Sequence, residues 1–332
     1  MTKEKNYSFL AELSNTRAAI MGIAIIWIML FHSGIQAPDN KILCALWYIF
    51  VSFGGGIGVN LFFILSGFGL YYSVSKYPDI ASIDWLTWGK KRLVRLLPSY
   101  LIVSVLYYLL KGDLSVYNIL WLNFWIDGVR DFWFIPGIAV CYLLFPAIYI
   151  LAKKWGFGKV TVILLLILVL GNFLFEVACT DYFAKIEIFT WRLPCFVIGV
   201  YLGYLTKEKP QYKWKVAYII ALVLLVLSFV LTNLSRPTFV VLTILFLPVL
   251  TRIVTLIKWG LPWLNTALDY CGSRSLQIYL LHVSIVPLLL TMIWRFDLIL
   301  YFILSFLLSE ILYRLTSLIK INPEHKHATK RR

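Results

Sequence analysis

Residues 160–170 read Val160-Thr161-Val162-Ile163-Leu164-Leu165-Leu166-Ile167-Leu168-Val169-Leu170, without one charged side chain. A second run, Ala18–Phe31, is also uncharged and largely apolar. The strands of a membrane barrel alternate apolar and polar residues, whereas these runs are continuous. Such runs therefore predict helices that cross a membrane.

The composition of the whole chain agrees with these two runs. Of 332 residues, 61% are hydrophobic and 14% are charged, and the mean hydropathy is +0.83. A soluble domain carries about 25% charged residues. The roughly 200 apolar residues suffice for about ten spans of about 20 residues each. This composition excludes a soluble globular enzyme, a disordered tail protein and a disulfide scaffold.

We predict an all-α, polytopic membrane helix bundle of about ten transmembrane helices, with the N- and C-termini cytoplasmic. Residues 1–321 would form the membrane domain and 322–332 a polar cytoplasmic tail. The predicted spans lie at about 18–35, 45–74, 94–110, 132–151, 160–177, 189–205, 216–232, 238–257, 275–293 and 298–318.

The net charge of +15 has a topological explanation. When Arg95 and Arg252, near the ends of their spans, are counted with the adjoining connections, 23 of the 31 Lys and Arg residues fall on one side, six on the other side and two within spans. Basic residues concentrate in cytoplasmic loops of membrane proteins. The asymmetry therefore predicts the orientation in the cell membrane, with the lipid bilayer as partner, and requires no nucleic acid.

Two histidines stand out because ionisable groups are costly within a membrane. His32 ends the first predicted span near its outer face, about 22 Å along the helix from Arg17. An imidazole is the natural general base at neutral pH, although His32 is equally compatible with a structural role at the interface. His282 lies midway along the ninth span and needs a polar partner, with Tyr279 one turn earlier. A purely structural histidine is the alternative here too.

Polar residues mark the next two spans. Asn60 and Ser66 lie in the small-residue segment 58–68, where Asn60 could orient His32 or bind a hydroxyl group. Close helix packing explains the same segment. Arg92 and Arg95 share one helix face, and arginine forks suit phosphate oxygens. Anchoring of the span at the cytoplasmic side is the alternative.

The outer side offers further candidates. Arg192 follows Trp191 near the outer end of the sixth span, where it could hold a developing oxyanion or extend toward the interface. Trp133 belongs to a group of outer aromatic residues that could stack on a sugar or form an interfacial belt. Glu310 and Arg314 are four residues apart, which predicts an ion pair within one helix.

Six pieces of sequence, taken in this order, resemble the membrane-bound acyltransferase 3 family of bacterial O-acyltransferases. They are Gly22-Ile23-Ala24 with Phe31-His32, Gly58-Val59-Asn60-Leu61-Phe62-Phe63-Ile64-Leu65-Ser66-Gly67-Phe68, Arg92-Leu93-Val94-Arg95-Leu96-Leu97-Pro98, Trp133 with Tyr142-Leu143-Leu144-Phe145-Pro146, Arg192-Leu193-Pro194 with Phe196 and Gly199, and Ser275-Leu276 with Tyr279-Leu280-Leu281-His282.

The resemblance implies that His32 is the catalytic histidine and that Arg92 and Arg95 belong to an acyl-CoA site. Family members usually carry an arginine eleven residues before this histidine, where this chain has Met21. Arg17 lies one turn earlier on nearly the same face and could reach the same place. Many members also have a glutamate in the fourth span, in the stretch occupied here by residues 138–139 (Ile-Ala).

The resemblance thus implies an O-acyltransferase that moves an acyl group, acetyl first among the candidates, from cytoplasmic acyl-CoA to a hydroxyl of a cell-surface polysaccharide or glycolipid. Acyl-CoA would be a co-substrate, and no metal is expected. Direct transfer and a transient acyl-histidine are both compatible with these residues. The assigned roles are His32, Asn60 and Arg192 in catalysis, Arg17, Arg92 and Arg95 in acyl-CoA binding, and Trp133, Ser66 and His282 in substrate binding.

Three alternatives stay open at this point. A glycan or lipid transporter or flippase would share the helix bundle and lack acyl-transfer chemistry. A different membrane acyltransferase would use His282 as its base. A structural membrane subunit would have no reaction at all. The oligomeric state and the identity of the acceptor glycan are left open as well.

Overall fold

The computed structural model describes residues 9–36, 38–208, 236–292 and 297–319 of the chain. All regular elements in these ranges are helices, with no strand among them. Nine segments of the described chain are long and apolar enough to cross a membrane. They confirm the predicted all-α polytopic bundle. The predicted span at 216–232 lies outside the described residues.

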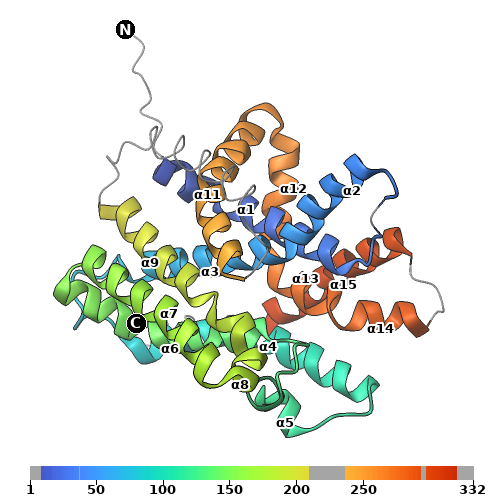
Figure 1. Ribbon diagram of the computed structural model, residues 1–332, viewed down its shortest axis with the longest axis horizontal. Helices are drawn as coiled ribbons and strands as arrows, with labels where there is room; N and C mark the ends of the chain where they lie inside the picture. The colour runs from blue at the N-terminus through green and yellow to red at the C-terminus, as the bar shows by residue number, and fades with distance from the viewer. Residues whose placement is uncertain (1–8, 37, 209–235, 293–296, 320–332) are drawn as a thin grey trace, which may run out of the picture.

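Figure 1 shows the arrangement of the elements. Their bounds are α1 Phe9–His32, α2 Lys41–Trp47, η1 Tyr48–Ser52, α3 Phe53–Val74, α4 Trp85–Leu110, α5 Val116–Ile119, η2 Asn123–Asp127, α6 Phe134–Trp155, α7 Phe157–Ala178, α8 Thr180–Thr190, α9 Leu193–Glu208, α11 Arg236–Gly260, α12 Pro262–Ser273, α13 Ser275–His282, α14 Ile285–Met292 and α15 Leu298–Ile319.

Two of the membrane segments are interrupted helices. Segment 180–208 consists of α8 and α9, which are separated at Trp191 and Arg192. Segment 275–292 consists of α13 and α14, which are separated at Val283 and Ser284. Interrupted helices within membranes expose backbone groups that neighbouring protein must satisfy, and they often mark functional sites. Here the interruption of the second segment places His282 at a helix end.

Helix α1 begins at Phe9, well before the start predicted near residue 18. Phe9 is also the first residue of this part of the chain that the structure describes. Within these early turns, Arg252 Nη1 on α11 donates to Glu12 Oε1 at 2.6 Å, and Glu12 is buried. A charge is tolerated within a helix bundle when another charge compensates it. The early turns of α1 therefore belong to the bundle despite their polar sequence.

Helices α1 and α3 form the centre of the bundle, in contact with each other and with α9, α11 and α12 (Figure 1). Glycines allow the closest approaches. A Cβ at Gly67 of α3 would collide with the backbone of α9, and one at Gly199 of α9 would collide with that of α3. Gly22 of α1 and Gly272 of α12 make a similar mutual contact. Small residues bring membrane helices together in this way.

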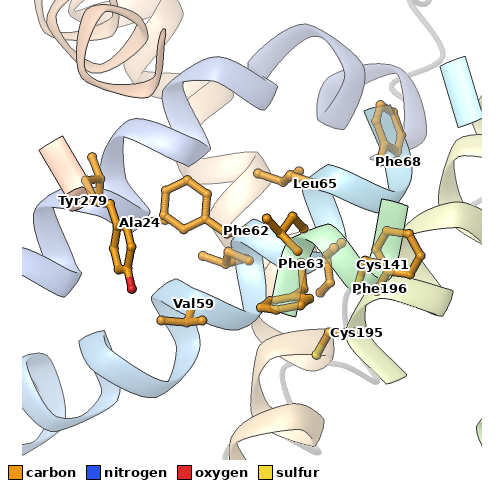
Figure 2. Close-up of a cluster of buried hydrophobic side chains, with 14 of the residues drawn as sticks. Ala24, Val59, Phe62, Phe63, Leu65, Phe68, Cys141, Cys195, Phe196 and Tyr279 are labelled. Carbon is orange, nitrogen blue, oxygen red and sulfur yellow. The ribbon is translucent and has the colours of Figure 1, made fainter. Parts of the chain in front are cut away.

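Aromatic and aliphatic side chains fill the space between the central helices. Figure 2 shows part of this core, with Phe62, Phe63 and Phe68 of α3 close to Phe196 of α9 and Cys141 of α6. By contrast, α7 exposes most of its apolar side chains. In a bilayer such a surface faces lipid, so its exposure agrees with a helix at the edge of the bundle.

Candidate active site

His32 and His282 lie side by side, although they come from opposite ends of the sequence. Their ring centroids are 5.4 Å apart and the ring planes are inclined by 57°. In each ring, Nδ1 is hydrogen-bonded to the carbonyl oxygen four residues earlier, to Ile28 at 2.9 Å and to Ile278 at 2.8 Å. A carbonyl oxygen only accepts, so Nδ1 carries the proton in the neutral rings and Nε2 keeps its lone pair.

The two histidines differ in their accessibility. The side chain of His32 is exposed, whereas His282 is completely buried. Within the described chain, Nε2 of His282 is a buried atom with no hydrogen-bond partner. Tyr279, the neighbour expected to satisfy His282, contacts it ring to ring at 5.9 Å, while the hydrogen bond goes to the backbone. His32 is therefore accessible at the surface of the described chain, and His282 is not.

Three arginines gather near the other end of α1. Arg17 of α1 and Arg92 and Arg95 of α4 lie within electrostatic range of one another and of Tyr142 on α6. Among the described residues, no carboxylate forms an ion pair with any of these three arginines. The Nε atoms of Arg17 and Arg92 are buried without a hydrogen-bond partner. Such uncompensated guanidinium groups are suited to bind an anion with several oxygens.

Packing holds this arginine cluster in place. The guanidinium group of Arg17 lies directly against Gly69 of α3, where a Cβ would collide with it. The guanidinium carbon of Arg92 lies 5.2 Å from the centre of the Trp88 ring. Cation–π contacts of this kind orient a guanidinium while leaving its N–H groups free for a ligand. Arg95 is exposed.

A partly enclosed cavity of about 130 Å³ begins at the arginine cluster. Residues of α1, α3, α4, α6 and α13 line it: Met21, Ile28, Val59, Phe62, Ser66, Arg95, Leu96, Phe134, Ile138, Tyr142, Ser275, Leu276 and Tyr279. Most of this lining is apolar, so the cavity suits an uncharged chain more than a second charged group.

The cavity extends toward the histidines. Arg95 and Tyr142 line its arginine end, where Met21 lies one helical turn from Arg17. Along α1 the lining continues to Ile28, whose carbonyl accepts the hydrogen bond of His32. On α13 it includes Tyr279, one turn before His282. Arg95 of the arginine cluster therefore lines the same cavity as Ile28 and Tyr279, which contact the two imidazoles.

Other predicted residues lie in different surroundings. Asn60 donates its hydrogen bond to Thr243 Oγ1 of α11 at 3.0 Å and not to His32. The guanidinium carbon of Arg192 lies 5.2 Å from the centre of the Trp133 ring, and both side chains are largely buried. Ser66 lines the cavity with Arg95. Ser66 and Arg95 thus line the same cavity, whereas Arg192 packs against Trp133.

Two tyrosines of the cavity received no site role in the sequence analysis. Tyr142 lies beside the three arginines, and Tyr279 accepts a hydrogen bond from the backbone N–H of Phe134 at 3.4 Å. The available signal was a phenol within an otherwise apolar span, one turn before a histidine in the case of Tyr279. Among the described residues, no group of three or more His, Cys, Asp or Glu side chains is placed to hold a metal ion.

Comparison with known proteins adds an independent result. The sequence matches the family model of an acyltransferase domain, the acyltransferase 3 domain, over residues 20–314. That range holds both histidines, the cavity lining and every candidate site residue except Arg17. No curated protein and no solved structure matches the chain. Because the match extends over nearly the whole helix bundle, the chain belongs to the acyltransferase 3 family and is a multi-pass membrane acyltransferase.

Proposed function

We propose that this acyltransferase uses acyl-CoA as donor, with acetyl as the first candidate for the acyl group, and acylates a hydroxyl of a cell-surface polysaccharide or glycolipid. One observation carries the proposal. One mostly apolar cavity is lined by Arg95 of the arginine cluster and by Ile28 and Tyr279, which contact the two imidazoles. Acyl-CoA has the same division, with a polyanionic nucleotide at one end and a thioester at the other.

The arginine cluster supports the donor assignment. Acyl-CoA carries a diphosphate and a further phosphate, and each offers oxygens that match the planar guanidinium fork. Arg17, Arg92 and Arg95 have no carboxylate partner among the described residues, so their mutual repulsion is uncompensated until an anion binds. The pantetheine arm would then follow the apolar lining toward His32.

The histidine pair supports the assignment of the base. His32 is exposed and keeps the lone pair of Nε2, so it can accept the proton of an acceptor hydroxyl as the oxygen attacks the thioester carbonyl. His282 is completely buried, and its ring lies 5.4 Å from that of His32. Direct transfer needs only these steps. An acyl group carried briefly on Nε2 of His32 would give ping-pong kinetics instead.

The distribution of basic residues supports a cytoplasmic position for Arg17 and an outer position for His32. The basic connections alternate along the chain, and those at the Arg17 end would be cytoplasmic, where acyl-CoA is made. His32 would then lie near the outer face of the cell membrane, where surface glycans are reached. The protein would carry an acyl group across the membrane within its own cavity.

Binding of acetyl-CoA to the purified protein tests the donor assignment. Arg95→Ala is expected to weaken binding at least tenfold, since one phosphate contact is worth about 1.5–3 kcal/mol. Lys91→Ala is the matched control, because it removes the same charge from an exposed position on the same helix. Equal affinity of the Arg95→Ala variant and the wild type would contradict the donor assignment. Loss of O-acetyl groups from the surface glycans of cells lacking the gene would identify the acceptor.

A further inference from the structure

Tyr279 occupies a position that the function described so far leaves unused. It lies on α13, its side chain is buried, and it lines the cavity together with Val59 and Phe62 of α3. Figure 2 shows it at the edge of the apolar core, on the side where Val59 and Phe62 lie. Its ring packs against Phe134 at 5.3 Å and against His282 at 5.9 Å.

The Tyr279 hydroxyl accepts a hydrogen bond from the backbone of α6. The backbone N–H of Phe134 donates to it at 3.4 Å, so the oxygen acts as an acceptor in this bond. Phe134 is the first residue of α6, and the N–H groups of a first turn have no partner within the helix. They also form the positive end of the helix dipole. This N–H therefore polarises the phenol oxygen. Among the described residues, no group accepts the hydrogen of the Tyr279 hydroxyl.

We infer that Tyr279 is a catalytic residue that donates its hydroxyl hydrogen to the carbonyl oxygen of the thioester. This inference rests on the proposed function, since it requires an acyl thioester in the cavity. A phenol held by a helix N-terminus in an apolar cavity is a preorganised donor for an oxygen that becomes negative.

The chemical step then uses two groups of this chain, the imidazole of His32 and the hydroxyl of Tyr279. The acceptor oxygen bonds to the carbonyl carbon, and its proton passes to Nε2 of His32. The carbonyl electron pair moves onto oxygen, where the Tyr279 hydroxyl stabilises it by a hydrogen bond. When that pair re-forms the carbonyl, the carbon–sulfur bond breaks and the thiolate leaves with the proton of the His32 imidazolium. Tyr279 keeps its own proton throughout.

The Tyr279→Phe variant tests this inference in the full-length protein with acetyl-CoA as donor. It keeps the ring contacts with Phe134 and His282 and removes only the hydroxyl. We expect kcat to fall about 10²–10³-fold, the usual effect of losing one oxyanion donor, while the Kd for acetyl-CoA stays within twofold. Tyr100→Phe is the matched control: Tyr100 is equally buried and donates to the carbonyl of Ile119 at 3.0 Å, outside the cavity.

A second variant distinguishes the loss of the hydroxyl from a change in packing. Incorporation of 3-fluorotyrosine at position 279 retains the hydroxyl, and kcat is expected to remain within about tenfold of the wild type. A Tyr279→Phe protein with wild-type kcat, or a fluorotyrosine protein as slow as the phenylalanine variant, would overturn the inference while acyl transfer itself stands. If the wild type transfers no acetyl group from acetyl-CoA, the proposed function fails first.

Discussion

The ring centroids of His32 and His282 lie 5.4 Å apart. Each ring is oriented by a hydrogen bond between its Nδ1 and a backbone carbonyl in the preceding turn of its own helix. In the neutral rings, the same nitrogen, Nε2, is therefore left without a proton. Burial then separates them, because His32 is exposed and His282 is not. The two histidines therefore differ in exposure although their rings are in contact.

Replacement of the two histidines should therefore have different consequences. His32→Ala is expected to lower kcat by at least about 10²-fold, the usual share of a general base, with little change in thermal stability. His282→Ala should destabilise the protein, because it opens a cavity in a packed core. The measurements are acetyl transfer and melting temperature of each purified variant. Full activity of His32→Ala with loss in His282→Ala would make His282 the base.

The role of Arg17 can be tested by moving its charge along α1. Arg17→Ala should raise the Kd for acyl-CoA at least tenfold, since it removes one of three clustered guanidinium groups. Adding Met21→Arg to that variant should restore much of the affinity, because Met21 lies one turn away and lines the cavity. Titration of acetyl-CoA into both variants is the measurement. A double variant no better than Arg17→Ala would mean that Arg17 binds from a position that residue 21 does not reach.

Much of the fold follows from local sequence properties. Continuous apolar runs predicted the membrane helices, and the spacing of Arg92 and Arg95 predicted that they would lie on one face. The first span was predicted from about residue 18, whereas α1 also includes the turn of Glu12, which is paired with Arg252 far away in the sequence. A local pattern of charges cannot contain such a pairing.

The site was predictable only in part, for the same physical reason. His32 and the arginines were identified by the cost of placing charge in a membrane. That His282 would touch His32 depends on the packing of α13 against α1. The donor to the Tyr279 hydroxyl is a backbone N–H, which has no residue-type signature. Contacts between helices, and hydrogen bonds with the backbone, thus cannot be predicted from the sequence alone.

Gly69 offers a test of the arginine cluster that leaves every arginine in place. In Gly69→Ala, the new methyl group would collide with the end of the Arg17 side chain, which must move because it is the more flexible partner. We expect the KM for acyl-CoA to rise about threefold to tenfold, a loss of about 1 kcal/mol, with kcat nearly unchanged. Gly171→Ala on α7, where a Cβ meets open space, is the control. An unchanged KM in Gly69→Ala would show that the position of Arg17 does not matter for the donor.

The carboxylate of Glu310 should contribute to the stability of the protein and little to the rate of acyl transfer. Glu310 accepts hydrogen bonds from Arg274 Nε at 2.5 Å, Tyr270 at 2.7 Å and Arg314 Nε at 2.7 Å, which ties α15 to the connection that precedes α13. Glu310→Gln removes the charge that holds Arg274, whose side chain is only 17% exposed.

The melting temperature of Glu310→Gln is therefore expected to fall by at least about 2 °C, with acetyl transfer at low temperature within tenfold of the wild type. Arg314→Gln is the control for the confirmed pair within α15. The Arg314 side chain is 78% exposed, and so open an ion pair adds little. Equal melting temperatures for the two variants would show that the Arg274 contact adds no stability. A loss of transfer in Glu310→Gln as large as that of His32→Ala would instead assign this carboxylate to the reaction.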